Sequence, residues 1–260
     1  MNKLNILFTI CGRAGSKGLK NKNIQYFLGY PLVGYTLAVI SLYIEKYCKQ
    51  QSIDVCLNTD SVELTKLVKM QSDVHVMYLK RDLSLSEDNT PKLAVIKDCL
   101  SRCEQTTGKN YDIIVDLDIT SPLRTLADVE NAINLKIEKT YTDVVFSVTN
   151  SRRSPYFNMV YKKGDSFCQA IPTDFTARQQ VPETYDMNAS IYAYERSFLV
   201  TNTTNRLFDG CCWAFSMMDT AVLDIDCEED FELMQVIAEF FYVRRPEMKL
   251  IRNRVSKQYH

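Results

Sequence analysis

Short apolar runs alternate with longer amphipathic stretches along this chain as far as Asn150. The short runs, such as Ile6–Ile10, read as buried strands, because they are continuously apolar and end at turn residues. The longer stretches repeat apolar residues at the spacing of one helix face. We predict strands at Asn5–Cys11, Ile53–Asn58, Val74–Leu79, Tyr111–Leu117 and Asp143–Thr149, and helices at Leu32–Tyr47, Val62–Lys69, Pro91–Cys103 and Ala127–Lys139.

This alternation predicts an α/β fold in which helices cover both faces of a mostly parallel sheet. The chain has 260 residues, enough for one sizeable core, and shows no internal repeat and no low-complexity linker. We therefore expect a single domain over residues 1–260. Ligands of such sheets bind at the carboxyl ends of the strands, so the loops there are the first place to look for a site.

The pattern changes after Asn150. Residues 151–187 are rich in Arg, Tyr, Phe and Pro and show no clear helix, so we interpret them as an excursion from the sheet, such as a β-ribbon arm. Regular patterns return with predicted strands at Asn188–Tyr194 and Ala221–Asp226 and a predicted helix at Phe231–Arg244.

A glycine-rich, cationic loop follows the first predicted strand. The segment from Cys11 to Asn23 contains Gly12, Gly15, Gly18, Ser16, Arg13, Lys17, Lys20 and Lys22. Glycine lets the backbone approach a ligand closely, and cations neutralise phosphate oxygens, so the loop suits a polyphosphate. It is neither a Walker A loop nor the spaced dinucleotide fingerprint. Taken alone, it could equally be an ordinary basic turn.

Two carboxylates, Asp224 and Asp226, stand at the end of a predicted strand. Positions two apart in extended backbone share a face, where two carboxylates repel each other unless a cation lies between them. Oxygen ligands of this kind suit Mg²⁺, which usually also binds substrate phosphates. The alternative is a helix start, with Asp226 as the N-cap and further acids in the first turn.

Two other segments could bind an anion or shape a pocket. Thr120–Arg124 (TSPLR) makes a tight turn after a predicted strand, although a plain strand-to-helix connection would look similar. Arg178 precedes Gln179 in the irregular region, where its guanidinium could pair with a carboxylate. A single arginine is more often a solvated surface charge.

Composition excludes several classes of protein. The formal net charge of −1, from 31 basic and 32 acidic residues, argues against a general nucleic-acid binder. Nine unpaired-looking cysteines without a CxxC motif, and only two histidines, argue against a zinc site and favour a reduced, cytoplasmic protein. The first apolar run is too short for a signal peptide or a membrane span.

Together these segments resemble the cytidylyltransferases that activate acidic sugars, the CMP-sialic acid synthetase family. The similarity runs nearly end to end. The matching motifs are Gly12–Gly18 with Lys22-Asn23, Pro31-Leu32 with Tyr35-Thr36, Asn58–Asp60, Thr120–Arg124, Arg178-Gln179, Asn188–Tyr192, and Asp224–Asp226 with Glu229–Phe231. The resemblance implies a Rossmann-like, GT-A-like nucleotidyltransferase fold. It also implies a reaction of CTP with an acidic nine-carbon sugar that yields the CMP-sugar and pyrophosphate.

The resemblance also implies roles for individual residues. It assigns catalysis to Arg13, Lys17, Asp224 and Asp226, with Mg²⁺ on the two aspartates. Nucleotide binding falls to Gly12, Arg13, Gly15, Ser16, Lys17, Lys22, Asn23 and Arg81, and sugar binding to Asp118, Ser121, Arg178, Gln179, Asp186, Asn188 and Tyr192. The segment 151–187 resembles the dimerisation element of the family, which implies a homodimer.

Departures from the sialic-acid motifs narrow the expected sugar. Asp118, Asp186-Met187 and Ala189 stand where many sialic-acid members carry Gln, Arg-Pro and Gly, and they resemble the branch that activates legionaminic acid. Exchanging a cation for an acid removes one sugar contact and adds an acceptor for hydroxyl or amide groups. Activation of N-acetylneuraminic, pseudaminic or 3-deoxy-octulosonic acid remains the nearest alternative. A glycosyltransferase or a non-catalytic nucleotide-binding protein are the more distant ones.

Overall fold

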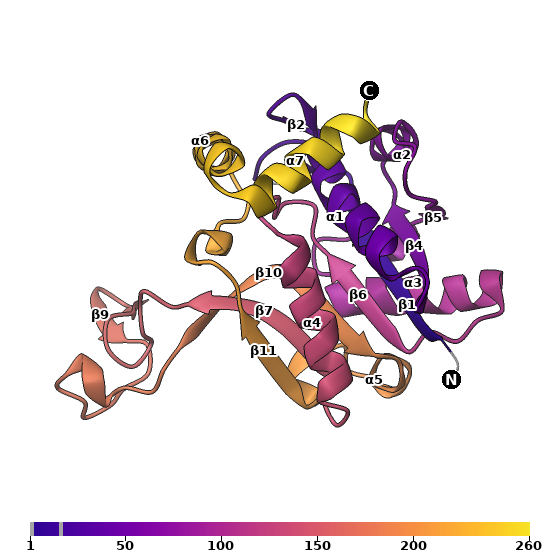
Figure 1. The fold of residues 1–260 in the computed structure, drawn as a ribbon. Helices are drawn as coiled ribbons and strands as arrows, with labels where there is room; N and C mark the ends of the chain where they lie inside the picture. The colour runs from indigo at the N-terminus through magenta and orange to yellow at the C-terminus, as the bar shows by residue number, and fades with distance from the viewer. Residues whose placement is uncertain (1–2, 16–17) are drawn as a thin grey trace.

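A seven-stranded sheet organises the protein, for which a computed structural model describes residues 3–15 and 18–260, with the main chain but not the side chains of residues 178 and 222 (Figure 1). The strand order is β11-β7-β10-β6-β1-β4-β5. The strands are β1 (Leu4–Cys11), β4 (Gln51–Thr59), β5 (Met77–Lys80), β6 (Ile113–Leu117), β7 (Val144–Asn150), β10 (Tyr185–Glu195) and β11 (Cys212–Ser216). Neighbours pair in parallel except where β10 lies antiparallel to β6 and β7, which confirms the mostly parallel sheet.

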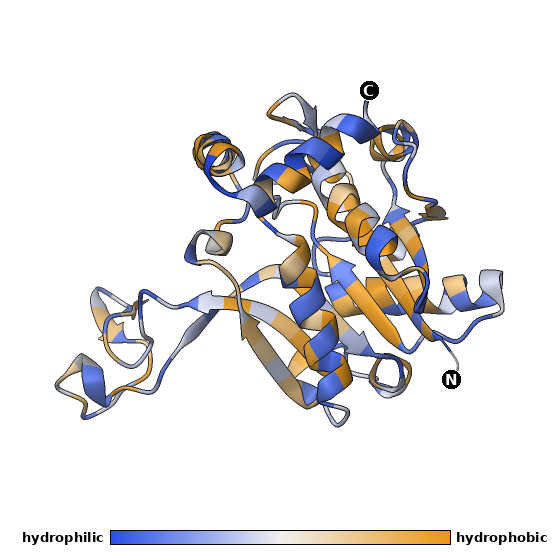
Figure 2. Ribbon diagram, in the orientation of Figure 1, coloured by the Kyte–Doolittle hydropathy of each residue, from blue (hydrophilic) through white to orange (hydrophobic). Residues whose placement is uncertain are grey.

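Helices cover both faces of this sheet, as predicted. One core lies under α1 (Leu32–Tyr47), α2 (Val62–Lys69), α4 (Leu126–Glu138), α6 (Glu228–Arg244) and α7 (Pro246–Gln258). The other lies under α3 (Lys92–Thr107) and α5 (Arg196–Thr201). Because successive side chains of a strand point to opposite faces, Phe8 enters the first core and Leu7 the second. This explains why the central strands are apolar over most of their length, as Figure 2 shows.

The predicted strand at Ala221–Asp226 is wrong. Residues Asp219–Val222 form a 3-10 helix, η5, and Leu223–Asp226 have no regular secondary structure. The place beside β7 is taken by β11, which the sequence pattern did not reveal because this edge strand is only partly buried. The segment looked strand-like because Ile225 is fully buried, yet its N–H donates to Thr120 O at 3.3 Å instead of joining a ladder.

The region after β7 leaves the body of the molecule and returns to it in β10 (Figure 1). It contains an antiparallel hairpin of β8 (Val160–Lys163) and β9 (Ser166–Gln169), followed by the 3-10 helix η3 (Arg178–Gln180). This confirms the expected β-ribbon arm. Its hairpin carries exposed apolar side chains, among them Val160 and Phe167.

Short elements complete the fold. They are η1 (Lys22–Ile24), β2 (Tyr26–Phe27), β3 (Tyr30–Pro31), η2 (Leu83–Leu85) and η4 (Leu207–Asp209). Helix α7, which the apolar pattern also did not reveal, packs on α1 and α6 through buried Met248, Ile251 and Val255.

Candidate active site

A pocket of about 220 Å³ lies at the carboxyl ends of β1, β5 and β6, where ligands of parallel sheets bind. Among the described residues, its charged lining consists of four cations, Arg13, Lys22, Arg81 and Lys92, and four acids, Glu87, Asp88, Asp118 and Asp224. Asn23 and Thr120 add polar groups. The pocket therefore joins the glycine-rich loop, the turn after β6 and the acidic segment before α6. A second cavity, about 310 Å³ at the base of the arm, contains none of the predicted site residues.

The glycine-rich loop is held by its backbone. Gly12 N–H donates to Asn58 O at 3.2 Å, and Ala14 N–H donates to the Asp60 carboxylate at 2.7 Å. Gly15 has a φ of 70°, which favours glycine. The predicted phosphate-binding residues Ser16 and Lys17 lie outside the described residues.

The end of this loop rests on the acidic segment. Leu19 N–H donates to Asp226 O at 2.7 Å, and a Cβ on Gly18 would lie 2.0 Å from the same oxygen. The Lys22 ammonium donates to Ile225 O and to the Asp226 carboxylate, both at 3.1 Å. Two segments about 200 positions apart in sequence thus form one unit.

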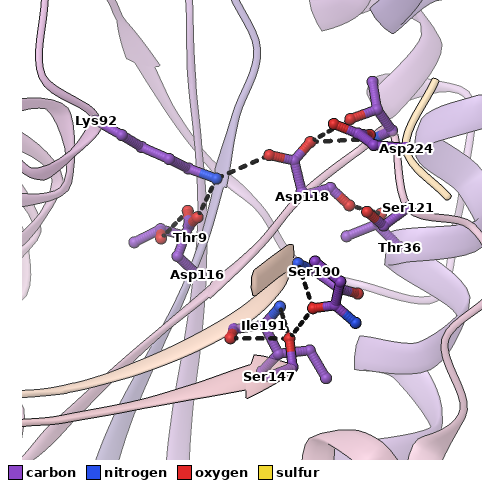
Figure 3. Close-up of polar contacts among 12 residues, drawn as sticks. Thr9, Thr36, Lys92, Asp116, Asp118, Ser121, Ser147, Ser190, Ile191 and Asp224 are labelled. Carbon is purple, nitrogen blue, oxygen red and sulfur yellow. Dashed lines mark hydrogen bonds and ion pairs between the residues drawn. The ribbon is translucent and has the colours of Figure 1, made fainter. Parts of the chain in front are cut away.

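Of the two predicted metal ligands, only Asp224 lines the pocket. The Asp226 side chain is 76% exposed and faces Lys22. Because residues 223–226 are not a strand, the argument that both carboxylates share a face fails. Instead Asp118 is the pocket carboxylate that lies close to Asp224 (Figure 3). Burial raises the pKa of Asp224, and the charge of Asp118 adds to the rise.

Lys92, a residue that the sequence analysis missed, joins the carboxylates of β6 and the turn that follows it. Its ammonium lies 2.7 Å from Asp116 Oδ2 and 2.8 Å from Asp118 Oδ2 (Figure 3). Asp116 is fully buried and also accepts a hydrogen bond from Thr9 Oγ1 at 2.8 Å. Burial alone would raise the pKa of Asp118, but the Lys92 charge and the hydrogen bonds from Thr120 outweigh it and hold that pKa well below its usual range.

The two pocket arginines are held differently. Arg81 is buried and donates through Nε to Asn58 Oδ1 at 2.7 Å and through Nη2 to Asn58 O at 3.0 Å. Arg13 pairs with the half-exposed Asp88 at 2.6 Å. Asn23, predicted to contact the nucleotide, donates its side-chain amide to Arg13 O at 3.1 Å and so also braces the loop.

The turn after β6 is fixed by Arg124, the last residue of the TSPLR motif. This buried guanidinium donates to Ser190 O at 2.6 Å, Asp118 O at 2.7 Å and Ser121 O at 3.3 Å. Burial lowers the pKa of Arg124 to about 10, which still leaves it charged at neutral pH. Ser121, predicted to bind the sugar, is buried, and its hydroxyl has no hydrogen-bond partner among the described residues.

The other predicted sugar residues do not gather in this pocket. Asn188 is buried in a bulge of β10, where its Oδ1 accepts from Ser147 Oγ at 2.6 Å and its amide reaches Met217 Sδ at 3.3 Å. Tyr192 stands beside the pocket, with its ring centroid 5.6 Å from the Lys92 ammonium. Three others lie elsewhere: Asp186 at the start of β10, and Arg178 and Gln179 in η3 of the arm.

No helix among the described residues is long and apolar enough to cross a membrane. No group of three or more His, Cys, Asp or Glu side chains in the same residues could hold a metal ion. A cation in this pocket would therefore take at most two carboxylates from the described chain.

The chain matches a known protein family over most of its length. A family model described as Cytidylyltransferase matches residues 7–232. The post-translational flagellin modification protein B of Campylobacter coli is 34% identical over 233 residues, 89% of this chain and 94% of that protein. The CMP-N,N′-diacetyllegionaminic acid synthase of Campylobacter jejuni matches with the same identity and coverage.

Solved structures show the same fold. A CMP:2-keto-3-deoxy-manno-octonic acid synthetase in complex with CTP aligns with a TM-score of 0.63, over 91% of this chain and 99% of that one. The two sequences are 14% identical, so this likeness concerns the fold alone.

Proposed function

Because this chain belongs to the cytidylyltransferase family, we propose that it transfers CMP from CTP to legionaminic acid or a closely related nine-carbon 2-keto acid sugar. The protein is a nucleotidyltransferase of the acylneuraminate cytidylyltransferase type, and it activates an acidic sugar with CTP. The observation that carries the proposed CMP transfer is the pocket that joins the glycine-rich loop to Asp224, Asp118 and the pocket cations.

The cations of this pocket suit a triphosphate. Arg13 is paired with an acid on the pocket rim, and Lys22 with the exposed Asp226. Exposed ion pairs contribute little to stability, so either cation can exchange its carboxylate for a phosphate oxygen at small cost. Arg81 is already oriented by Asn58. We assign the triphosphate to Arg13 and Lys22, together with Lys17, Ser16 and the amides around Gly15 from the sequence motif.

The pocket also fits Mg²⁺. This ion needs only one or two carboxylates when substrate phosphates and water complete its shell, and Asp224 and Asp118 supply two. The raised pKa of Asp224 reflects a buried carboxylate beside another acid, a strain that a divalent cation would relieve. When bound, the ion would neutralise phosphate charge and favour ionisation of the attacking hydroxyl. In this proposal, Asp226 loses its ion pair with Lys22 when the Lys22 ammonium moves to a phosphate oxygen of CTP.

In the proposed reaction, the anomeric hydroxyl of the sugar attacks the α-phosphorus of CTP in line, and pyrophosphate leaves. Charge builds on the phosphoryl oxygens and on the leaving group, so fixed cations aimed at them lower the barrier. Arg13, Lys17 and Lys22 hold the leaving pyrophosphate. No covalent nucleophile is required.

Relatives and residues together favour legionaminic acid. The 34% identity to a CMP-N,N′-diacetyllegionaminic acid synthase extends over nearly the whole of both chains. Asp186, Gln179 and Arg178 lie at or near the arm, where an added sugar could be held between arm and body.

The arm, with its exposed apolar side chains, also supports a proposed homodimer. Light scattering at micromolar concentration tests the dimer, and a monomeric mass would contradict it.

The experiment for the proposed function measures pyrophosphate release with CTP, Mg²⁺ and a panel of acidic sugars. The panel contains legionaminic, N-acetylneuraminic, pseudaminic and 3-deoxy-octulosonic acids, with a no-sugar control. Release with legionaminic acid alone, abolished by EDTA, is the expected result. Fast release with another sugar would identify that sugar, and not legionaminic acid, as the substrate. Absence of release with every sugar would contradict the proposed function.

A further inference from the structure

Among the pocket cations that the structure describes, only Lys92 is held in position by a fully buried acid, Asp116. Arg13 and Lys22 pair with acids that are exposed or half exposed, so these two cations can change partners. Lys92 instead rests on Asp116, which has no exposed surface and depends on this ammonium for neutralisation. Moving the ammonium away would leave a buried, uncompensated charge, so Lys92 stays in place.

The Lys92 ammonium has an N–H group that no described residue engages. A lysine carries three N–H donors. The hydrogen bond to Asp118 Oδ2 at 2.8 Å uses one of them, and the ion pair with Asp116 Oδ2 at 2.7 Å engages at most one more. Among the described residues no third acceptor contacts Nζ, and the side chain is 37% exposed as part of the pocket wall. A donor therefore remains for a ligand.

This donor lies between the predicted nucleotide-binding residues of the pocket and Tyr192, a predicted sugar-binding residue. Arg13, Lys22 and Arg81 line the nucleotide part of the same pocket. On its other side, Lys92 faces the ring of Tyr192, which stands on β10 next to the predicted sugar residues. An anionic oxygen that enters between these groups meets a cation that needs no reorganisation, which is the arrangement that stabilises developing charge.

We propose that Lys92 contacts the substrates directly, its free N–H donating to an anionic oxygen of the reacting pair, either on the α-phosphate of CTP or on the carboxylate of the sugar. This inference rests on the proposed function. It makes the buried Asp116 the positioning residue for Lys92, while Asp118, which also accepts a hydrogen bond from this ammonium, remains the proposed second carboxylate for Mg²⁺.

The test must separate substrate contact from simple neutralisation of Asp116. Lys92→Met alone leaves Asp116 buried and unpaired, so it should lower the melting temperature. The double variant Lys92→Met/Asp116→Asn removes both charges and keeps an Oδ1 acceptor for Thr9. We expect the double variant to regain most of the melting temperature while kcat/KM stays down about 100-fold, the usual cost of losing one such donor. Recovery of kcat/KM to within about threefold of Asp116→Asn would overturn the proposal.

The kinetic constants of the double variant identify the oxygen. A weaker Kd for CTP, measured by calorimetry without sugar, or a loss confined to kcat, assigns the contact to the α-phosphate. An unchanged Kd for CTP with a raised KM for the sugar assigns it to the sugar carboxylate. Lys97→Met is the matched control, because Lys97 lies on the same helix but donates to Asn202 and Asn205 outside the pocket, and its kinetics should match wild type.

A second measurement excludes an effect transmitted only through Asp118. In an Asp118→Asn background, Lys92→Met/Asp116→Asn should still reduce kcat/KM if Lys92 touches the substrate. If that further loss disappears, Lys92 acts only by positioning Asp118, and the proposal is overturned. Failure of the wild-type protein to release pyrophosphate with any sugar would instead contradict the proposed function, so the two failures are distinguishable.

Discussion

The nucleotide side and the sugar side of the candidate site are built in different ways. On the nucleotide side, main-chain hydrogen bonds fix the glycine-rich loop to Asn58, Asp60 and Asp226 before any ligand arrives. On the sugar side, the Asn188 side chain is buried in the β10 bulge and accepts a hydrogen bond from Ser147, whereas Gln179 lies exposed in the arm. If the proposed function holds, recognition of the nucleotide is part of the fold, whereas recognition of the sugar depends on the arm, the part of the chain that leaves the body.

The largest expected effect comes from breaking the nucleotide side at Gly18. A Cβ there would lie 2.0 Å from Asp226 O, a backbone atom that cannot move aside cheaply. Gly18→Ala should therefore displace the loop from the acidic segment and reduce kcat/KM for CTP by about 100-fold or more, since misplaced groups lose orientation. Steady-state kinetics and circular dichroism measure activity and fold.

The control for this variant is Gly164→Ala in the arm. Gly164 has a positive φ of 62°, unlike Gly18, and no atom lies within 4 Å of its added Cβ. That change should cost roughly 1 kcal/mol of stability at most and leave the KM for CTP unaltered. Equal kinetics for Gly18→Ala and wild type would show that the contact between loop and acidic segment is dispensable.

The next effect distinguishes the two aspartates of the acidic segment. Asp224→Asn removes a half-buried pocket carboxylate, and we expect a loss of roughly 100-fold in kcat that added Mg²⁺ does not restore. Asp226→Asn changes an exposed carboxylate that faces Lys22, so its loss should be about tenfold smaller. Pyrophosphate release across a Mg²⁺ titration measures both. A larger loss for Asp226→Asn would place it, and not Asp118, beside Asp224 on the metal.

Sequence reasoning succeeded where the signal was local. The apolar run of β1 and the glycines after it lie within one segment, and both were predicted. Lys92 was missed because its partners Asp116 and Asp118 lie 24 and 26 positions away on another element, with no motif to link them. The strand expected before Asp224 was wrong because burial of Ile225 imitates a strand residue. The spacing of apolar residues cannot show whether a buried residue belongs to a strand of the sheet or only packs into the core.

A smaller effect concerns the bulge on the sugar side. Ala189 has a φ of 53°, in the left-handed region that disfavours side chains, and the bulge presents Ser190 O to Arg124. Ala189→Gly should relieve that strain, partly offset by a more flexible unfolded chain, and stabilise the protein by about 0.5–1 kcal/mol. Urea unfolding measures it. Loss of stability would mean that the Ala189 methyl group makes packing contacts worth more than the strain.

The smallest expected effect lies at the far end of α3, away from both sides of the site. Arg196 donates to both oxygens of Glu104, at 2.7 and 3.0 Å, and these hydrogen bonds lower the pKa of Glu104. A carboxyl whose pKa is lower in the folded state adds stability above its unfolded pKa, near 4.3, and loses it as the pH falls through the folded pKa. Glu104→Gln should therefore cost about 1 kcal/mol or less at pH 7 and progressively less in acid.

Thermal unfolding of wild type and Glu104→Gln at several pH values measures this difference in stability. A difference that grows as the pH falls would contradict the prediction.

The same variant also sharpens the contrast between the two sides of the site. Helix α3 carries Lys92 in its first turn and Glu104 near its end. If the nucleotide side is fixed locally by Asp116, the KM for CTP should stay unchanged in Glu104→Gln. A raised KM would show instead that the whole helix positions Lys92, so that the pocket depends on contacts at the opposite edge of the sheet.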